Sequence, residues 1–208
     1  MRDIIIIGSG GHSRAVISIV KASRKWRNVS NVDLEYKANT ETILGVPIVG
    51  GIKFLDTVNV NITDIFIAIG DNLIRRNFIS LVIKKGFKIP NLIHENAFID
   101  SDAILGYANF IGSGTNLGAD VRIGNGNIIN TLANIDHESK IGNYNHLSPS
   151  SFFCGRVFIG NLTLLGANST ILPFLEIADK TIIGAGAVVT HNIENSGLTF
   201  VGVPAKKI

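Results

Sequence analysis

Cysteine is nearly absent from this sequence of 208 residues, since Cys154 is its single thiol. One cysteine excludes a disulfide framework and is typical of a protein from a reducing compartment. Long apolar runs are missing too, because the isoleucine run at residues 4–7 is far shorter than the roughly 20 residues of a membrane helix. A strand-like segment and a glycine loop follow Met1 almost at once, unlike a signal peptide. We therefore expect a soluble, cytoplasmic protein with no membrane partner.

The charge balance points to no particular partner. The chain has 19 Lys and Arg residues against 16 Asp and Glu residues, which gives a formal net charge of +3. Its densest basic cluster consists of Lys21, Arg24, Lys25 and Arg27. No recognised nucleic-acid motif accompanies this cluster, and basic residues at the end of a helix are commonly a solvated surface. We expect no nucleic-acid partner.

Strand-like and helix-like patterns alternate over residues 1–92. The apolar runs at residues 4–7 and 65–69 predict buried strands. Apolar residues at helical spacing predict helices over residues 15–20 and 73–82. Short loops between such elements favour a small parallel sheet with helices packed on it. The sequence therefore predicts an α/β, Rossmann-like domain over residues 1–92.

The middle of this domain is less regular. Residues 29–34 predict one further strand. Residues 35–61 are poorly patterned, and we expect a long loop with one or two short strands there.

A period of six residues governs the chain from Ile93 onward. Every sixth position from Ile93 to Val189 is aliphatic or phenylalanine, which makes seventeen positions without an insertion. Neither a helix nor a hairpin sandwich has this period, whereas the hexapeptide repeat of a parallel β-helix does. Three hexads close one triangular coil, so we expect roughly five to six coils over residues 93–190. Residues 191–208 would then form a C-terminal tail.

Two histidines, His137 and His146, lie in the middle of the repeats. The segment Asp136-His137-Glu138 departs from the hexad pattern, because glycine commonly occupies the position of Asp136. A histidine beside a carboxylate suits general-base catalysis near neutral pH. Zinc binding is the competing use of paired histidines, but no third histidine lies near them. We therefore expect no metal.

The first predicted strand ends in the glycine loop Gly8-Ser9-Gly10-Gly11-His12-Ser13. This loop departs from the dinucleotide motif G-x-G-x-x-G at Ser13, although Asp33 lies near the acidic position that holds a ribose. A plain tight turn between a strand and a helix explains the loop equally well. Backbone N–H groups at the start of a helix can also hold a diphosphate. Nucleotide binding without redox chemistry is the more economical interpretation.

Taken together, these motifs resemble those of one family, the bacterial sugar O- and N-acyltransferases. This family includes the sialic acid O-acetyltransferases and, nearest to this sequence, the UDP-4-amino-sugar N-acetyltransferases of bacillosamine synthesis. The resemblance covers both halves of the chain. It rests on the following segments: Gly8-Ser9-Gly10-Gly11-His12, Ile67-Ala68-Ile69-Gly70-Asp71-Asn72 with Arg75, Asn91-Leu92-Ile93-His94, Asp136-His137-Glu138, His146 and Val201-Gly202-Val203-Pro204-Ala205-Lys206.

The resemblance implies a left-handed parallel β-helix and a homotrimer, with acetyl-CoA bound in the groove between adjacent subunits. It also implies transfer of an acetyl group from acetyl-CoA to the 4-amino group of a nucleotide-linked sugar. UDP is the expected nucleotide, and the product would serve bacterial surface or protein glycan synthesis. A sialic acid O-acetyltransferase and a non-catalytic hexapeptide scaffold are the alternatives, and Glu138 together with His146 favours the amine branch.

Roles for individual residues follow from the same resemblance. His137 matches the family's base, Glu138 the carboxylate that strengthens it, and Gly155 the backbone N–H that stabilises the oxyanion. The positions that match acetyl-CoA contacts are His146, Ala167 and Ala185. The positions that match the nucleotide-sugar pocket are Gly10, Gly11, His12, Asp33 and Gly70.

Overall fold

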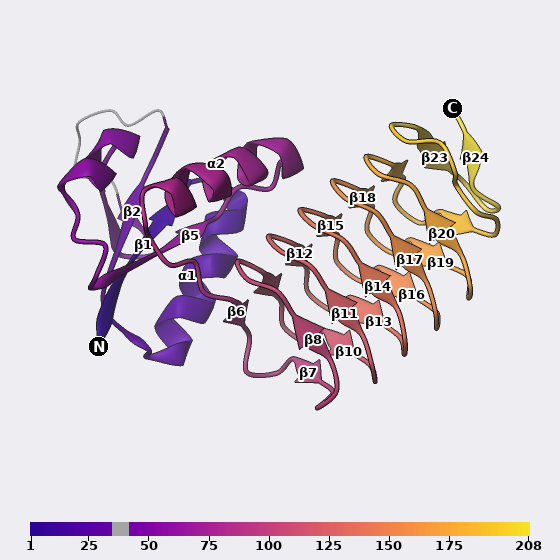
Figure 1. Cartoon of the computed structure of the whole chain (residues 1–208), viewed down its shortest axis with the longest axis horizontal. Helices are drawn as coiled ribbons and strands as arrows, with labels where there is room; N and C mark the ends of the chain where they lie inside the picture. Colours follow the sequence, from indigo (N-terminus) through magenta and orange to yellow (C-terminus); the bar gives the residue numbers. More distant parts are fainter. Residues whose placement is uncertain (35–41) are drawn as a thin grey trace. The chain divides into compact units, whose positions relative to one another are not determined.

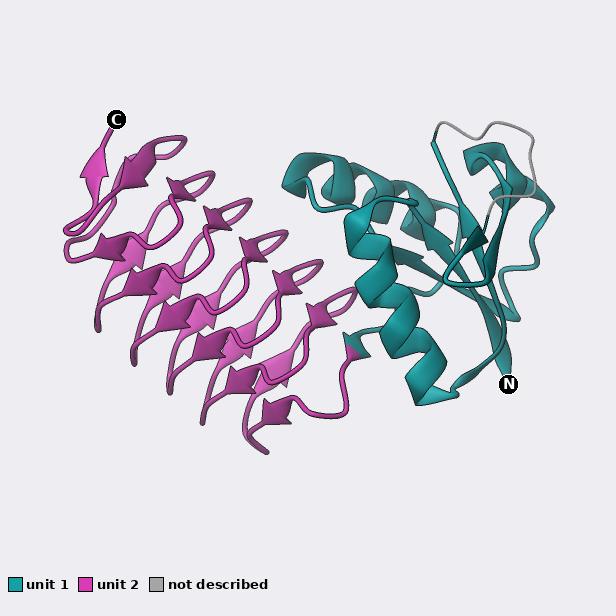
Figure 2. Cartoon of the chain, turned by 180° about the vertical axis from the view of Figure 1, so that it is seen from behind, with its two compact units in different colours: residues 1–92 teal, residues 93–208 magenta. Residues whose placement is uncertain are grey.

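The computed structural model describes residues 1–34 and 42–208 (Figure 1). The chain divides into two compact units, Met1–Leu92 and Ile93–Ile208 (Figure 2). The interpretation of residues 35–61 falls partly outside the described residues, because residues 35–41 are not among them. In the described ranges, no helix has the length and apolar character needed to cross a membrane.

The first unit is a five-stranded sheet with two helices. Its strand order is β3-β4-β2-β1-β5, and all neighbours are parallel except the β3–β4 pair. The elements in chain order are β1 (Arg2–Ile7), α1 (Gly11–Ser23), β2 (Trp26–Val32), β3 (Thr42–Ile43), β4 (Val46–Gly50), the 3₁₀ helix η1 (Ile52–Thr57), β5 (Thr63–Ile67) and α2 (Asn72–Lys84). The two strands β3 and β4 lie within the poorly patterned segment.

The elements of this unit form because their apolar residues share one face or one core. The central strand β1 buries all four of its isoleucines, as expected for a parallel strand covered on both sides. In α1 the residues Val16, Ile17 and Val20 are buried at helical spacing. The start of α2 is capped by Asp71, whose carboxylate accepts a hydrogen bond from the Ile74 N–H at 2.8 Å.

The second unit is a parallel β-helix built from three sheets of short strands (Figure 1). The β13 sheet contains β7 (Phe98–Ile99), β10 (Asn116–Leu117), β13 (Asn134–Ile135), β16 (Phe152–Phe153), β19 (Thr170–Ile171) and β22 (Val188–Val189). The β14 sheet contains β8 (Ile104–Leu105), β11 (Arg122–Ile123), β14 (Lys140–Ile141), β17 (Phe158–Ile159) and β20 (Glu176–Ile177). The β15 sheet contains β6 (Leu92–Ile93), β9 (Phe110–Ile111), β12 (Ile128–Ile129), β15 (His146–Leu147), β18 (Leu164–Leu165), β21 (Ile182–Ile183), β23 (Thr199–Val201) and β24 (Lys206–Lys207).

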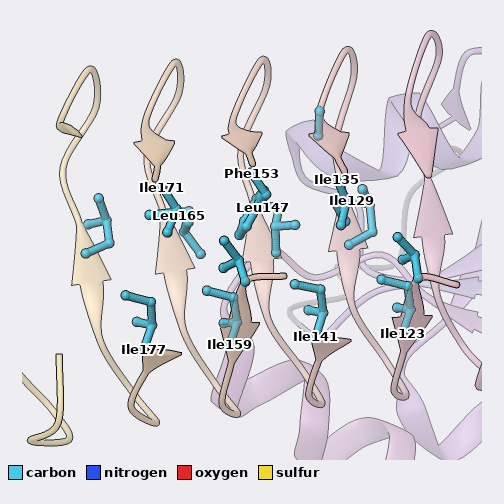
Figure 3. Packing of buried hydrophobic residues seen from close by; sticks show 14 of the residues in the cluster. Ile123, Ile129, Ile135, Ile141, Leu147, Phe153, Ile159, Leu165, Ile171 and Ile177 are labelled. Atoms are coloured by element: carbon cyan, nitrogen blue, oxygen red, sulfur yellow. The ribbon is translucent and has the colours of Figure 1, made fainter. Parts of the chain in front are cut away.

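The register of these sheets shows that three hexads close each coil. Leu117 pairs with Ile135, and Ile135 pairs with Phe153, each time 18 residues along the chain. From β9 to β22 the second residue of each strand is buried in the interior, where the aliphatic ladder forms a continuous core (Figure 3). Burying each such side chain stabilises the coil by about 1.5–3 kcal/mol. The expected period of six therefore corresponds to the spacing of the side chains that fill the core.

Partly buried asparagine side chains connect successive coils at one corner. The Asn143 Oδ1 accepts hydrogen bonds from the backbone N–H of Asn125 at 2.9 Å and from its Nδ2 at 3.1 Å. The Nδ2 of Asn143 in turn donates to Asn161 Oδ1 at 2.9 Å. Each asparagine thus satisfies a backbone donor that the turn leaves unpaired.

We expect Asn143→Ala to lower the free energy of unfolding by about 1–3 kcal/mol, because it leaves the Asn125 N–H without its acceptor. Urea unfolding followed by circular dichroism measures this change. Ser101→Ala, at an exposed turn position, serves as the control and should change stability by less than about 0.5 kcal/mol. Equal stability of the Asn143 variant and the control would contradict a structural role for the ladder.

Residues 191–208 continue the β-helix at its C-terminal end. Ile193 is buried and forms a bridge with Ile177. Strand β23 adds in parallel to β21, and β24 pairs with β23 in the antiparallel direction. This segment therefore extends the β15 sheet and covers the end of the core.

Candidate active site

The turns that join the β13 sheet to the β14 sheet form the corner on which His137 lies, called here the His137 corner. The residue at the second position of these turns differs from coil to coil. Ala119, His137, Gly155 and Pro173 stack there at intervals of 18 residues. The Asp136 side chain accepts a hydrogen bond from the His137 backbone N–H at 2.8 Å and so shapes the turn. Glu138 follows with a φ of 60°, a left-handed conformation that the turn imposes.

His137 and Glu138 form a hydrogen-bonded pair. The His137 Nδ1 lies 3.0 Å from the Glu138 Oε2, and the two side chains are 52% and 42% exposed. Hydrogen bonds from Arg156, then from His137, hold the pKa of the Glu138 carboxyl below its ordinary value. An ionised carboxylate can only accept hydrogen bonds, so Nδ1 carries the proton of a neutral imidazole. The lone pair of that imidazole is then on Nε2, where a general base needs it.

Gly155 lies over the imidazole, one coil beyond His137. A Cβ at Gly155 would lie 2.5 Å from both Cε1 and Nε2 of His137. Any other residue would push the ring out of its place. The absence of a side chain here leaves open the space directly in front of the basic nitrogen.

At the corner turns of the described residues, the backbone N–H groups of Gly155, Ala167 and Ala185 have no acceptor within the chain. They occupy the second position of a corner turn, after Cys154, Gly166 and Gly184 respectively. At two other turns the preceding side chain accepts this N–H: Asn130 accepts from Thr131 and Asp136 accepts from His137, each at 2.8 Å. The three N–H groups are therefore free to donate to a ligand. They are the same three positions that the resemblance assigns to backbone contacts.

His146 and the two alanines lie elsewhere on the prism. His146 is the outward residue of β15, and its Nε2 lies 3.5 Å from the Asn130 Nδ2. Ala167 and Ala185 stack on the corner between the β15 and β13 sheets, called here the Ala167 corner. The His137 corner is opposite the β15 sheet in a three-sided coil. One chain therefore brings His137, Glu138 and Gly155 together but separates them from His146.

The glycine loop of the first unit lines a cavity of about 480 Å³. All five residues that the sequence assigns to a nucleotide-sugar pocket contribute to its wall: Gly10, Gly11, His12, Asp33 and Gly70. The α1 helix begins after Gly10 with no side-chain cap, and the positive end of the helix dipole at this point favours an anion. The hydroxyl of Ser9 donates a hydrogen bond to Asp33 and orients that carboxylate.

Gly8 and Arg75 contact the segment of residues 68–70 that forms part of the cavity wall. Gly8 has a φ of 107°, and a Cβ there would lie 3.0 Å from the Ala68 carbonyl oxygen. The guanidinium of Arg75 donates to the carbonyl oxygens of Ile69 at 3.1 Å and of Gly70 at 2.9 Å. Burial lowers the pKa of Arg75 to about 9. These contacts hold the Ile69–Gly70 segment of the wall in place.

Sequence reasoning missed the roles of Ser9, Arg75 and Arg156. Arg156 could have been found from the repeat, because it lies 18 residues after Glu138 and must stack on it. Arg75 was recognised as part of a motif, but its contacts depend on a helix turning back over the preceding loop. The described residues contain no group of three or more His, Cys, Asp or Glu side chains that could hold a metal ion.

Comparison with known proteins places this arrangement among sugar-modifying enzymes. Residues 3–82 match the family model described as the PglD N-terminal domain. The acetyltransferase domain of PglB from Neisseria gonorrhoeae has a TM-score of 0.94 and 27% identity, with all of both chains covered. GDP-perosamine N-acetyltransferase from Caulobacter crescentus, solved as a histidine variant with CoA and GDP-perosamine, has a TM-score of 0.94 and 33% identity over 100% of this chain and 97% of that chain.

The chain belongs to the bacterial sugar N-acetyltransferase family. The fold prediction is confirmed: a Rossmann-like unit precedes a left-handed parallel β-helix. WeeI from Acinetobacter baumannii has the same fold, with a TM-score of 0.90 at 23% identity over the full length of both chains. The chain is thus an acetyltransferase of this family, and the predicted enzyme class is confirmed.

Proposed function

We propose that this enzyme transfers the acetyl group of acetyl-CoA to the 4-amino group of a nucleotide-linked amino sugar. The observation that carries the proposal is the ionised Glu138 bound to Nδ1 of His137, which leaves Nε2 as a base beneath Gly155. The Caulobacter relative supports it, because that N-acetyltransferase was solved with CoA and GDP-perosamine. The acetyl-CoA complex of the Neisseria relative supports the same donor.

In the proposed reaction, the neutral amine attacks the thioester carbonyl, and a C–N bond forms as the carbonyl π bond becomes an oxyanion. Nε2 of His137 takes the proton from the nitrogen. The Gly155 N–H donates to the oxyanion, a kind of contact whose loss costs about 3 kcal/mol in other enzymes. The C–S bond then breaks, and the imidazolium returns its proton to the thiolate of CoA. The amide and free CoA are the products.

We further propose a homotrimer with its active sites between subunits. The separation of the assigned residues supports this assembly, because the His137 corner and the Ala167 corner lie on different edges of one prism. A neighbouring subunit can bring its Ala167 corner, with His146 nearby, to the His137 corner of the first. Acetyl-CoA would then contact His146, Ala167 and Ala185 of one subunit while the base of another acts on the substrate.

The cavity of the first unit is proposed to bind the nucleotide. The uncapped start of α1 suits a diphosphate, and the Asp33 carboxylate suits the hydroxyl or N–H donors of a nucleoside. UDP is the proposed nucleotide, because the motifs of the sequence resemble those of the UDP-4-amino-sugar N-acetyltransferases.

We expect Asp33→Asn to raise KM for the nucleotide sugar by about tenfold or more, because the variant loses a charge-assisted hydrogen bond. KM for acetyl-CoA should stay within about twofold, since the donor site is in the other unit. Initial rates at varied concentrations of each substrate measure both constants. Asp56→Asn, which alters the exposed pair with Lys85, is the matched control. A raised KM for acetyl-CoA instead would contradict the assignment of Asp33.

An acceptor panel tests the proposed function. Release of free CoA is measured with acetyl-CoA and UDP-, dTDP- or GDP-linked 4-amino sugars, and with free or CMP-linked sialic acid. We expect turnover on a nucleotide-linked amino sugar, with the UDP form used best. Turnover on sialic acid alone would favour the O-acetyltransferase, and a protein that binds no acetyl-CoA in a thermal-shift assay would be a scaffold.

A further inference from the structure

Arg156 makes a contact that the proposed reaction has not used. It stacks on Glu138 from the next coil, and its Nε donates to the Glu138 Oε2 at 2.9 Å. That same Oε2 contacts His137 Nδ1 at 3.0 Å. One carboxylate oxygen therefore joins the guanidinium to the imidazole.

The His137 corner fixes this arrangement through its left-handed turn residues. Asp120, Glu138, Arg156 and Phe174 follow one another at 18-residue intervals, with φ between 55° and 63°. We call these four residues the corner column. Because they share one backbone conformation, their side chains leave the corner in the same direction. The guanidinium of Arg156 also lies 5.7 Å from the centre of the Phe174 ring in the next coil. This contact restricts the movement of the guanidinium on the side away from Glu138.

The other cations around this corner are engaged elsewhere. Arg122 forms an ion pair with Asp120 at 2.7 Å, and the Lys140 ammonium lies 5.2 Å from the centre of the Phe158 ring. The largest cause of the lowered pKa of Glu138 is its hydrogen bond with Arg156. Arg156 is thus the cation that holds this carboxylate.

We propose that Arg156 is a positioning residue that clamps Glu138 so that its carboxylate selects the Nδ1–H tautomer of His137. An imidazole in water can carry its proton on either nitrogen, whereas the fixed carboxylate accepts from Nδ1 and leaves Nε2 unprotonated. The Glu138 side chain is 42% exposed, so without Arg156 it can turn toward water and release the ring. Arg156 acts through Glu138 and need not touch either substrate. The inference rests on the proposed function for its effect on the rate, but not for its effect on the tautomer.

The tautomer is measured without substrate on the full-length protein labelled with ring-¹⁵N histidine. Spectra are recorded at about pH 9, where imidazoles are neutral, and His137→Gln identifies the signals of the ring. We expect the wild-type ring to be mainly the Nδ1–H tautomer, and Arg156→Gln and Glu138→Gln to shift it to a mixture. Arg122→Gln, which removes the exposed cation paired with Asp120 of the corner column, should leave the wild-type signals unchanged.

A double-mutant cycle on the rate gives the second readout. We expect Arg156→Gln to lower kcat by about tenfold or more, because a base in the wrong tautomer cannot accept the proton. KM for acetyl-CoA should stay within about twofold, and Arg156→Lys should recover part of kcat. In the Glu138→Gln background, removing Arg156 should have almost no further effect.

Two results would overturn the proposal: wild-type ring signals in Arg156→Gln, or an effect of Arg156→Gln that persists in full when Glu138 is already glutamine. The second result would indicate that Arg156 acts directly on a substrate or on the packing of Phe174. A wild-type protein that acetylates no acceptor would contradict the proposed function instead, and the ring signals would still decide the role of Arg156.

Discussion

Replacing His137 with alanine should lower kcat by a factor of about a hundred to ten thousand, the usual contribution of positioned proton transfer. The imidazole is 52% exposed, so its removal takes away little packing. We therefore expect the melting temperature and the oligomeric state to stay those of the wild type. Free-CoA release under saturating substrates measures the loss, and thermal melting with light scattering verifies the fold.

The control for this variant is His191→Ala. His191 is exposed, and its ring nitrogen contacts the adjacent Thr190 hydroxyl at 2.8 Å. It belongs to the same unit as His137 but lies beyond the last hexad. Turnover of the His137 variant close to that of this control would remove the basis for assigning His137 as the base.

Adding a single methyl group at Gly155 should have an effect of similar size, about a hundredfold or more in kcat, through misplacement of the catalytic groups. The new Cβ would lie 2.5 Å from Cε1 and Nε2 of His137, so the ring must move. Because the ring is at the end of a half-exposed side chain, it can swing aside without disturbing the core. We expect Gly155→Ala to fold normally and to bind acetyl-CoA while losing most of its rate.

A double variant at residues 137 and 155 distinguishes displacement of the imidazole from a general disturbance of the turn. In a chain that already carries His137→Ala, the methyl group at residue 155 has no ring to displace, so adding Gly155→Ala should change the residual rate by less than about twofold. If the effects of the two substitutions on the rate multiplied in full, the methyl group would be acting on something other than the imidazole.

The repeat made much of the second unit predictable from the sequence. A period of six gives the inward positions, and three hexads per coil give the 18-residue register that pairs Leu117 with Ile135. The same register stacks Gly155 on His137 and Arg156 on Glu138. Such contacts follow from counting, because each coil repeats the geometry of the one before.

The first unit was less predictable because its contacts are not periodic. The alternation of strands and helices indicated a parallel sheet, and the glycine loop indicated a turn at the end of β1. Ser9 donates to Asp33, and Arg75 donates to the carbonyl oxygens of Ile69 and Gly70. Both contacts depend on side-chain directions that no local sequence pattern predicts. These contacts required the structure.

The separation of His137 from His146 shows a different limit. Both histidines lie within the repeats, and the resemblance assigned both to one site. A three-sided coil puts a turn residue and the outward residue of the opposite sheet on different sides of the prism. The proposed trimer would unite these residues through a neighbouring subunit, and the sequence of one chain does not describe an assembly.

We propose that His137 catalyses acetyl transfer from acetyl-CoA to the amine of a nucleotide-linked sugar. Analysis of the product that the wild type and His137→Ala make from acetyl-CoA and a UDP-linked 4-amino sugar tests this role. We expect the wild type to form an acetylated sugar that survives mild alkali, as an amide does, and the variant to form almost none. A product whose acetyl group is lost in mild alkali, or equal product from both proteins, would contradict the claim.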